Sequence, residues 1–538
     1  LDMASGNTVT ISGIANANVY GALSDNYATG NTVTISGTVN ACVYGGYGTL
    51  ASSKADTNTI NLGTKDGGIA KIGAAVISYA NAKCEPSQPG KDVLNVYGSG
   101  HTIGEDLYAT KANLNFYIKA EDLHAGGKTM VAVTRNAYIT ESTINAGVMN
   151  VGQVDVGDKI TLLSAGTLEA DATLKTGKLS DGLIDVDLQI AQEGNSITAT
   201  AGKAYVVEEP PKEEPPKENN ASANPNAKSP VETMAAAISL LNAGSDMLAT
   251  SSIMNAEQAV QMEKESAEAE GGMTVFTTVA GSNKRINSGS HVDMKAWNAN
   301  LGLAKEIANK SGKFLFAPVV EYGRGSYDSY LDNGVHGEGD SHFVGGGLLA
   351  KQTFNSNWYV DGSVRAGRMK ADYKTSDIGT GISYDNSATY YAAHLGAGKV
   401  VKMTEKSSMD YYGKLFYTHQ NSSTANLSSG HTYEFDAVDS FRTLLGLRYS
   451  QKAGKTASFY TGLAWQHEFD SECNATVRSG AWSAEAPAPS VKGDTGILEV
   501  GYKFTPGNSG NFDVDFGAAG YVGKQRGGSL KLNMQWKF

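Results

Sequence analysis

The sequence predicts an all-β protein built from an N-terminal region like a parallel β-helix, one pore-spanning α-helix, and a C-terminal antiparallel transmembrane β-barrel of about 12 strands. Three observations predict this fold. A repeat opens the chain, a single long helix candidate lies near the middle, and segments of alternating apolar and polar residues fill the second half. The 63 glycines and 26 tyrosines, against 12 prolines, fit an all-β protein with many tight turns.

Residues 1–205 are expected to form a repetitive β region. The segment from Gly6 to Gly13 recurs without change from Gly30 to Gly37, which gives a period of 24 residues. Within the first copy, Val9 and Ile11 share one strand face and the threonines share the other. Stacked solenoid coils would bury the Val/Ile ladder and expose the Thr ladder. Later copies of the repeat are degenerate, which is normal in a parallel β-helix, and a β-sandwich is the structural alternative.

Residues 206–230 are predicted to be a linker. The run from Glu208 to Glu218 alternates proline pairs with Glu and Lys. Such a composition cannot form a packed core and favours an extended chain. We therefore expect this segment to separate two structural regions.

Residues 231–270 form the only long helix candidate. Pro230 suits the start of the helix, and Gly271 with the next glycine suits its end. Gly244 and the Ser251-Ser252 pair predict a break or kink. The mixture of small, apolar and polar side chains fits a water-filled channel, and no run of about 18 apolar residues exists that would cross a membrane as a helix.

Residues 271–538 are expected to form a β-barrel in a bacterial outer membrane. Its last strand alternates strictly between an apolar face and a polar face of Lys, Asn and Gln residues. The apolar face consists of Leu530, Leu532, Met534, Trp536 and Phe538. This pattern is required of a strand between lipid and a water-filled lumen. A soluble sandwich also alternates, but aromatic residues near the strand ends and the length of the strands favour the membrane barrel.

An exported barrel leads to two further expectations. The chain begins at Leu1 without a signal peptide, so either a signal has been removed or the chain is a fragment. Cys42 and Cys84 could form a disulfide in an oxidising compartment, which would leave Cys473 unpaired. Free, partly buried thiols are the alternative.

The order of these parts resembles a bacterial autotransporter of the type V secretion system. A repetitive β passenger, a linker, a helix, amphipathic strands and a terminal aromatic residue all fit that layout. The segments Asp439–Tyr449, Gly496–Phe504 and Asn533–Phe538 resemble late strands of the family's translocator domain. The resemblance covers the whole chain in layout and is most specific in its C-terminal half.

The resemblance implies a mechanism and a set of partners. The outer-membrane β-barrel assembly machinery would insert a monomeric barrel into outer-membrane lipid and read the strand from Leu530 to Phe538 as its signal, after periplasmic chaperones have escorted the chain. The helix 231–270 would thread the pore and tether the passenger at the cell surface. Some members cut the passenger free at an Asn-Asn pair in the helix. Here Asn219-Asn220 lies in the linker and the helix has only the isolated Asn242 and Asn255, so we expect an uncleaved passenger.

Known catalytic and metal-binding patterns are not found in the sequence. Only His101 and His124 precede the linker, and Gly98-Ser-Gly100-His101 is interpreted as a turn because no nucleophile elbow occurs. Zinc-binding spacings such as His-Glu-x-x-His and Cys-x-x-Cys are missing, so neither a metal nor another cofactor is expected.

Two patterns in the barrel are interpreted structurally. Asp513 and Asp515 share a strand face and are expected to line the lumen, although a paired-acid site is the alternative. Gly345-Gly-Gly347 is not followed by a phosphate-loop lysine, and we expect it to leave lumen space for the helix. The net charge of −11 and the lack of a basic stripe argue against nucleic acid as a partner.

The leading functional hypothesis is an autotransporter whose passenger is an adhesin or surface-interaction module, without enzyme activity. It would bind an unknown host or bacterial surface ligand. A secreted enzyme passenger and a channel-forming outer-membrane protein are the alternatives.

Overall fold

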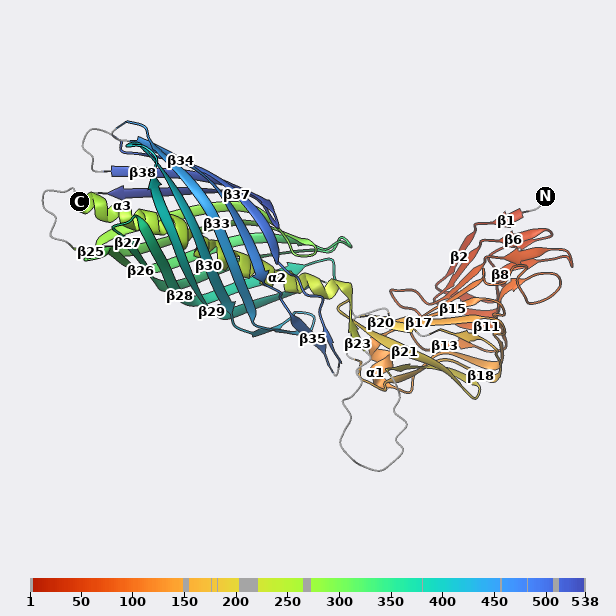
Figure 1. The fold of residues 1–538 in the computed structure, drawn as a ribbon. Coiled ribbons are helices and arrows are strands. Elements are labelled where there is room, and N and C mark those ends of the chain that lie inside the picture. The colour runs from red at the N-terminus through yellow and green to blue at the C-terminus, as the bar shows by residue number, and fades with distance from the viewer. Residues whose placement is uncertain are drawn as a thin grey trace, which may run out of the picture. The chain divides into compact units, whose positions relative to one another are not determined.

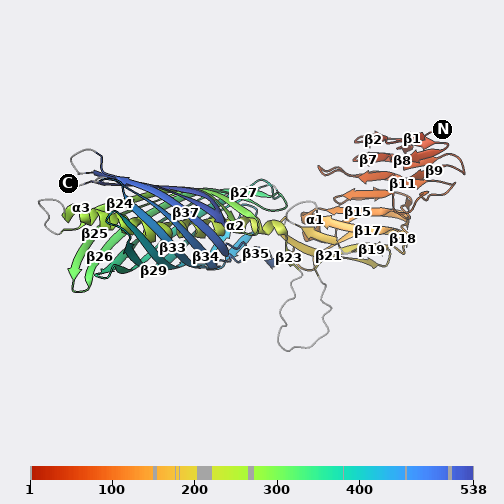
Figure 2. The same ribbon diagram turned by 45° about the horizontal axis from the view of Figure 1, so that its top comes forward.

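The chain folds into two compact units, which are shown in Figures 1 and 2. This computed structural model describes residues 3–148, 154–175, 177–180, 182–202, 221–264, 272–379, 381–454, 457–480, 482–506 and 512–536. The first unit comprises Leu1–Asn224 with Arg478–Ala484, and the second comprises Pro225–Val477 with Glu485–Phe538. Among the described residues, no helix combines the length and the apolarity needed to cross a membrane.

The N-terminal unit is a solenoid of parallel rungs, as predicted, and not a sandwich. Cross-strand partners occupy equivalent positions in successive rungs: Thr8 pairs with Thr32, and Thr32 pairs with Thr59. One face of the solenoid contains β2 (Thr8–Ile11), β7 (Thr32–Ile35), β10 (Thr59–Leu62), β12 (Val93–Tyr97), β15 (Asn113–Ile118), β17 (Thr143–Val148), β19 (Thr173–Leu174) and β20 (Gly177–Ser180).

The other strands of the rungs complete the coil around an aliphatic core. A second face contains β3 (Ile14–Ala15), β4 (Val19–Tyr20), β5 (Leu23–Ser24), β8 (Thr38–Gly48), β11 (Lys71–Tyr79), β13 (His101–Ile103), β14 (Leu107–Tyr108), β16 (Thr129–Tyr138) and β18 (Lys159–Glu169). The short strands β1 (Met3–Ser5), β6 (Tyr27–Thr29) and β9 (Lys54–Asp56) form a third sheet, and α1 spans Ala120–Ala125. Val33, Ile60 and Leu94 stack inside the coil and are fully buried.

Side-chain amides bind successive rungs to one another. Asn61, Asn95, Asn115 and Asn145 form an outer ladder in which the last three amides each donate to the carbonyl oxygen of the preceding amide at 2.9–3.0 Å. These pairs are 34, 20 and 30 residues apart, so the ladder keeps its register although the rung length varies. An ordered amide ladder satisfies polar groups that stacking would otherwise leave unpaired.

A second, buried ladder ends at an aspartate. Asn31 donates its side-chain amide to the Asn58 side chain at 3.0 Å, and the Asn58 backbone N–H donates to Asp92 at 3.0 Å. Burial raises the pKa of Asp92 to about 6. Because this folded-state pKa lies above the unfolded value, ionising Asp92 destabilises the fold, and the penalty disappears as pH falls toward the unfolded pKa.

We predict that Asp92→Asn stabilises the N-terminal unit by about 1–3 kcal/mol above about pH 6 and has little effect near pH 4. The amide keeps an oxygen that accepts from Asn58 and carries no charge. Urea unfolding of the full chain in detergent, followed by limited proteolysis of the N-terminal unit, measures the effect. Asp66→Asn, at an exposed turn, is the matched control. A stabilisation that does not change with pH would contradict the prediction.

The last part of the N-terminal unit is antiparallel. β18 pairs antiparallel with β22 (Ser196–Ala201), and β21 (Ile184–Glu193) pairs antiparallel with β20, β22 and β23 (Ala221–Ala223). The assignment of Ala221–Ala223 to the linker was therefore wrong. Its small side chains give no hydropathy signal, and the strand is formed by backbone pairing. Residues 206–220 of the predicted linker lie outside the described part of the chain.

The C-terminal unit is a closed antiparallel barrel of 12 strands, as predicted. The strands are β24 (Thr274–Asn287), β25 (His291–Asn309), β26 (Gly312–Tyr330), β27 (His336–Phe354), β28 (Trp358–Thr375), β29 (Ile382–Lys402), β30 (Ser407–Gln420), β33 (Val438–Lys452), β34 (Ala457–Asp470), β37 (Gly493–Phe504), β38 (Phe512–Gly523) and β39 (Gln525–Trp536). Pairing of β24 with β39 closes the barrel and leaves no free edge. Shorter strands β31 (Ser423–Asn426), β32 (Thr432–Phe435), β35 (Ala475–Ser479) and β36 (Trp482–Glu485) occur in the connections.

The predicted helix lies inside this barrel, as Figure 1 shows. It consists of α2 (Lys228–Met247), a π-helical turn (Leu248–Ser252) and α3 (Ile253–Lys264), preceded by a 3-10 turn at Pro225–Ala227. It therefore begins before Val231, the predicted start, with Pro230 in the first turn, where the missing N–H removes no helical bond. Residues 265–270 of the predicted helix lie outside the described residues.

The predicted irregularity occurs at only one of the two expected places. The Ser251-Ser252 pair lies in the π-helical turn, whereas Gly244 remains in a regular α-helix. A Cβ at Gly244 would lie 2.8 Å from a guanidinium nitrogen of Arg365 and 2.9 Å from the Phe343 ring. Gly244 is thus explained by close packing against the barrel wall, which the sequence does not reveal.

Candidate functional site

The interface between the helix and the barrel lumen is the candidate functional site, because it contains most of the buried polar contacts of the C-terminal unit. At the end where α2 begins, tyrosine hydroxyls from four parts of the barrel bind the helix. The bonds join Tyr373 to the Ser229 hydroxyl (2.7 Å), Tyr327 to the Thr233 hydroxyl (2.6 Å), Tyr384 to the Pro230 carbonyl (2.6 Å) and Tyr433 to the Ala227 carbonyl (3.0 Å). We call this set the tyrosine clasp.

A buried carboxylate anchors the same end of the helix. Glu232 is fully buried and accepts hydrogen bonds from Ser288 at 2.8 Å and from Ser290 at 2.5 Å. The ammonium of Lys228 lies 3.5 Å from Glu232, one helical turn away. Ser288 and Ser290 lie in the turn between β24 and β25, so this turn is fixed against the helix.

The central contact is a buried ion pair that reaches the helix backbone. The guanidinium of Arg365 binds both carboxylate oxygens of Glu321 at 2.9 and 3.0 Å. It also donates to the Leu241 carbonyl and, at 2.8 Å, to the Ser245 hydroxyl. Tyr390 donates to Glu321 at 2.6 Å. The Arg365 and Glu321 side chains are each only 1% exposed, so this network is desolvated and geometrically specific.

A second arginine binds the next turn of the helix. Arg442 forms an ion pair with Asp246 at 2.8 Å, and its guanidinium lies 4.8 Å from the centre of the Phe416 ring. Asn242 donates to Ser440 at 2.9 Å, and Ser440 donates to Glu468 at 2.7 Å. Asn242 is thus held by the barrel wall.

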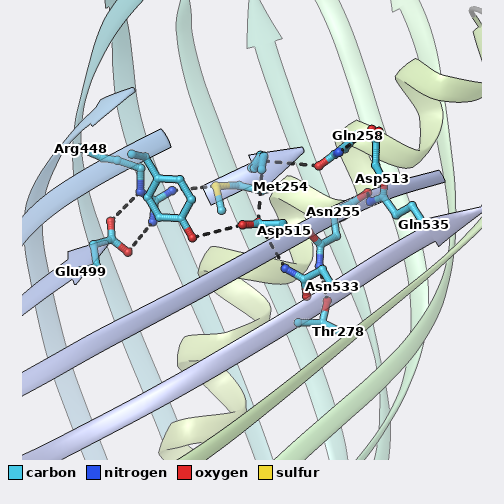
Figure 3. A network of polar contacts seen from close by, with 12 residues as sticks. Met254, Asn255, Gln258, Thr278, Arg448, Glu499, Asp513, Asp515, Asn533 and Gln535 are labelled. Carbon is cyan, nitrogen blue, oxygen red and sulfur yellow. Dashed lines mark hydrogen bonds and ion pairs between the residues drawn. The ribbon is translucent and has the colours of Figure 1, made fainter. Parts of the chain in front are cut away.

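After the π-helical turn, a polar network joins α3 to β24, β38 and β39, as Figure 3 shows. Asn255 donates to Thr278 at 2.7 Å, and the Asn255 carbonyl accepts a 2.6 Å bond from Gln535. Gln258 donates to Asp513 at 2.8 Å. The barrel therefore binds the helix along its whole described length.

The interior contains one group with the composition of a hydrolytic triad. Ser363 lies 2.5 Å from Nδ1 of His394, and Nε2 of His394 lies 2.8 Å from Asp361. However, Lys414 also binds both oxygens of Asp361 at 2.6 Å, and the His394 ring stacks on Phe416. Because His394 and Asp361 are each 1% exposed, we interpret this group as a structural network of the barrel wall.

The helix does not fill the lumen evenly. A cavity of about 130 Å³ lies between the helix and the wall formed by strands that include β24, β34, β37, β38 and β39. Asp246 and Thr250 contribute to it from the helix, and Lys284, Glu499 and Lys531 contribute from the wall. Such a volume with charged lining accommodates several water molecules.

The residues predicted to form the C-terminal assembly signal alternate as expected where they are described. Leu530, Leu532 and Met534 of β39 face outward, while Asn533 and Gln535 are buried toward the lumen. Trp536 is the last residue of β39, and Phe538 lies outside the described residues. The use of this strand as an assembly signal remains a prediction.

The other barrel expectations have mixed outcomes. Asp513 and Asp515 line the lumen as predicted, and Asp515 accepts a 3.3 Å bond from Asn533. The glycines at 345–347 do not make room for the helix directly. A Cβ at Gly345 would lie 2.2 Å from the Tyr390 hydroxyl, so this glycine makes room for a side chain of the central network.

The polar residues singled out in the passenger have structural surroundings. His101 is 1% exposed. Its Nδ1 accepts from the Ala70 N–H at 2.9 Å, which leaves the Nε2 hydrogen for the Tyr97 carbonyl at 3.0 Å. Burial lowers the pKa of His101. Cys42, Cys84 and Cys473 are free thiols, and a Cys42–Cys84 disulfide stays a prediction. Asn219-Asn220 lies outside the described residues.

One cluster that the sequence analysis missed has the composition of a metal site. His124, Asp155 and Asp158 offer ligand atoms within 4.8 Å of one another. The His124 ring lies 3.1 Å from Asp158 and 3.5 Å from Asp155. His124 is far from Asp155 and Asp158 in sequence, and the three residues match no spacing motif. All three side chains are partly exposed, and the direct contacts between the His124 ring and the two carboxylates account for the cluster without a metal.

A family model matches the C-terminal domain. Residues 275–517, from β24 into β38, match the family model of the autotransporter β-domain. The chain is 29% identical over 154 residues to the autotransporter adhesin/invasin TibA of Escherichia coli O78:H11 (strain H10407 / ETEC), covering 27% of this chain and 16% of TibA. It is 28% identical over 154 residues to autotransporter CRAC of Citrobacter rodentium (strain ICC168), covering 27% of this chain and 10% of CRAC. The alignments thus span a small part of these relatives.

The solved structures that match this chain include two autotransporter domains. The β domain of the Bordetella autotransporter BrkA matches with a TM-score of 0.40 and 16% identity, over 50% of this chain and 100% of that one. The transport unit of AIDA-I from Escherichia coli matches with a TM-score of 0.40 and 14% identity, over 53% and 98% of the two chains. The family match covers most of a closed barrel whose lumen binds a helix and whose outer face is apolar. The barrel of this chain contains an autotransporter β-domain and lies in the outer membrane, with the solenoid-like N-terminal unit at the cell surface as its passenger.

Proposed function

We propose that the passenger is an adhesin or surface-interaction module that the barrel translocates and then keeps anchored. The observation that supports an anchor is the continuous set of contacts from the tyrosine clasp to Gln258, which includes the buried Arg365–Glu321 pair. A helix held in this way cannot leave the lumen without exposing desolvated charges. We further propose an uncleaved passenger, because Asn242 and Asn255 are each followed by alanine.

The surface of the solenoid supports an interaction role. Its outer amide ladder repeats along the rungs, and the tyrosine pairs Tyr97–Tyr117 and Tyr108–Tyr138 stack at 4.6 and 4.7 Å. Rigid aromatic and amide groups in a fixed array make adaptable contacts at a low cost in conformational entropy. TibA, which is named an adhesin/invasin, is a relative at low identity.

Cell-surface assays test the proposal. Cells that express the full chain should adhere or aggregate, and cells that express a chain lacking residues 1–202 should not. The matched control for display is protease treatment of intact cells, which should remove the passenger and leave a folded barrel. Normal adhesion and aggregation by the deletion strain would contradict the adhesin role. A passenger that is resistant on intact cells yet cut after lysis would contradict surface display.

The assembly pathway is proposed from the same layout. The β-barrel assembly machinery and periplasmic chaperones would deliver a monomeric barrel to outer-membrane lipid. Translocation would end when the helix seats in the lumen, because the bonds from Arg365 to Leu241 and Ser245 form only with the helix in place.

We predict that removing the helix opens the barrel to ions. In planar bilayers, a chain that lacks residues 225–264 should show large, stable conductance steps, whereas the full chain should show small ones. The reason is that the helix runs through the lumen and occupies much of it, beside a cavity of about 130 Å³. Equal conductance of the two chains would show that the helix does not plug the pore, and would favour a channel function.

A further inference from the structure

The helix inside the barrel is continuously buried only near the end where it begins. Every residue from Ser229 to Ile238 of α2 is buried. Inward-facing barrel side chains at the same end of the lumen are buried as well, and they include Ile286, Val292, Tyr327, Tyr373, Tyr384 and Phe435. Large aromatic and aliphatic groups thus enclose this part of the helix, together with the bonds of the tyrosine clasp. We call residues 229–238 the seal segment.

Beyond the seal segment, one side of the helix is partly exposed inside the lumen. Partly exposed residues occur at Ser239, Ala243, Asp246, Thr250, Met254 and Gln258. They are three or four residues apart, so they share one side of the helix. The Asp246 side chain is 30% exposed, whereas that of Glu232 in the seal segment is 0% exposed. We call this side the exposed face of the helix.

Cavities follow one another along the exposed face. The cavity of about 130 Å³ shares Asp246 with a cavity of about 10 Å³ that also contacts Ser239. It shares Thr250 with a cavity of about 40 Å³ that also contacts Met254. Lys351, which lines the last of these cavities, lies near the end of β27. Space beside the helix therefore extends from Ser239 to Met254.

The lining of the largest of these cavities suits water. Asn298 and Gln466 line it, and Oδ1 of Asn298 and Nε2 of Gln466 are buried without a hydrogen-bond partner in the described part of the chain. Buried amide atoms of this kind are normally satisfied by ordered water. Asp246, Glu499 and Lys531 add charged groups to the same lining. The exposed face of the helix therefore has surroundings in which water is favourable.

The two ends of the lumen face different compartments. The passenger precedes the helix and lies at the cell surface, so the seal segment is at the outer end of the lumen. The exposed face runs the other way, toward Gln261 of α3, which is exposed. Near that end, Glu257 pairs with Lys351 and keeps 33% of its side chain exposed. The exposed face therefore leads to the periplasm.

We propose that the lumen is an aqueous vestibule open to the periplasm, and that the seal segment alone is the barrier to ions. A short section without water is enough to stop an ion, because the ion would lose its hydration there. The rest of the helix then serves to hold the passenger. Loosening the seal segment would open a narrow channel while the helix stays in place. The proposal concerns the barrel and does not depend on what the passenger binds.

Thiol labelling of the full chain in detergent maps where water reaches the helix. The native cysteines are first replaced by alanine, and one new cysteine is introduced at a time. Ala243→Cys and Thr250→Cys lie on the exposed face, and Ala236→Cys and Ala237→Cys in the seal segment are the matched controls. The probe is a small cationic methanethiosulfonate, and mass spectrometry measures its rate of reaction. Because only a hydrated thiolate reacts, we expect the exposed-face variants to react at least about 10-fold faster.

Planar bilayers locate the barrier to ions. Met234→Ala/Ile238→Ala removes apolar volume from the seal segment and should raise the conductance of the full chain severalfold. The matched control on the exposed face, Thr250→Ala/Met254→Ala, should leave the conductance unchanged, because these side chains already border water. Heat-dependent gel mobility verifies that both variants fold. If the seal variant fails to fold, the single change Ile238→Ala, with a smaller expected rise, replaces it.

The outcomes distinguish the proposal from its alternatives. Labelling confined to the exposed face, together with a rise in conductance in the seal variant only, supports it. Protection of all four cysteines would show that the cavities are closed, and would overturn the vestibule. Labelling of all four would show that water passes the seal segment, and would overturn it as the barrier. Unchanged conductance in a folded seal variant, or an equal rise in the control variant, would overturn it as well.

Discussion

Replacing Arg365 with alanine is expected to destabilise the helix-filled barrel by about 3–5 kcal/mol, because it leaves the buried carboxylate of Glu321 without its charge partner. Both side chains are 1% exposed, so water does not compensate for the loss. The same change removes the bonds to Leu241 and Ser245, and the helix loses its central attachment. Urea unfolding in detergent, followed by heat-dependent gel mobility, measures the free energy of unfolding.

Two comparisons make the Arg365 result specific. Arg285→Ala removes an exposed ion pair with Asp293 and should cost less than about 1 kcal/mol. Arg365→Met/Glu321→Met replaces the whole pair with apolar groups and should recover most of the lost stability. If Arg365→Ala behaved like Arg285→Ala, the pair would not hold the barrel together. If the double variant were less stable than Arg365→Ala, the charge argument would be wrong.

Replacing Leu532 with arginine is expected to cost about 2–4 kcal/mol and to reduce the amount of assembled barrel, because it places a charge against lipid. Leu532 is 43% exposed on the outer face of β39, where its cross-strand partners are Val279 and Phe516. These residues place it in the closing seam of the barrel. Refolding into lipid vesicles measures the energy, and the heat-modifiable fraction in cells measures assembly.

The control for Leu532→Arg lies on the same strand. Ser529→Lys adds a charge beside the cavity of about 130 Å³, where water and Glu499 can solvate it. We expect it to change the free energy of unfolding by less than about 1 kcal/mol. Equal defects in the two variants would show that β39 tolerates no charge on either face. Normal assembly of Leu532→Arg would contradict the membrane depth assigned to this strand.

Period-two alternation was enough to predict the barrel and its lipid face, because the side that a residue faces depends only on its position in its own strand. Leu530, Leu532 and Met534 point outward as the pattern requires. The central network could not be predicted in the same way. Glu321, Arg365 and Tyr390 come from three strands, and Ser245 comes from the helix. Their meeting depends on strand register and on the rotation of the helix, which no local pattern encodes.

The passenger shows the same division between local and long-range information. An exact repeat predicted the first rungs, and the buried Val33 and Ile60 agree with it. The buried amide ladder was not predicted from the sequence. Asn7 and Asn31 nevertheless occupy the same place in the repeat, and their side chains are hydrogen-bonded at 2.9 Å. The antiparallel strands near Ala221 gave no signal, because strand pairing there depends on partners such as Ile184 and Val186.

The distribution of contacts along the helix has a mechanical consequence. A cell that holds a surface by its passenger transmits traction along the helix axis. The bonds of the tyrosine clasp, the Arg365 network and the Asn255–Thr278 contact lie at successive depths in the lumen. A force along the helix axis therefore acts on all of these contacts at the same time, in the direction parallel to the interface. Sliding by one turn would break all of them at once, so the anchor resists force better than any single contact would.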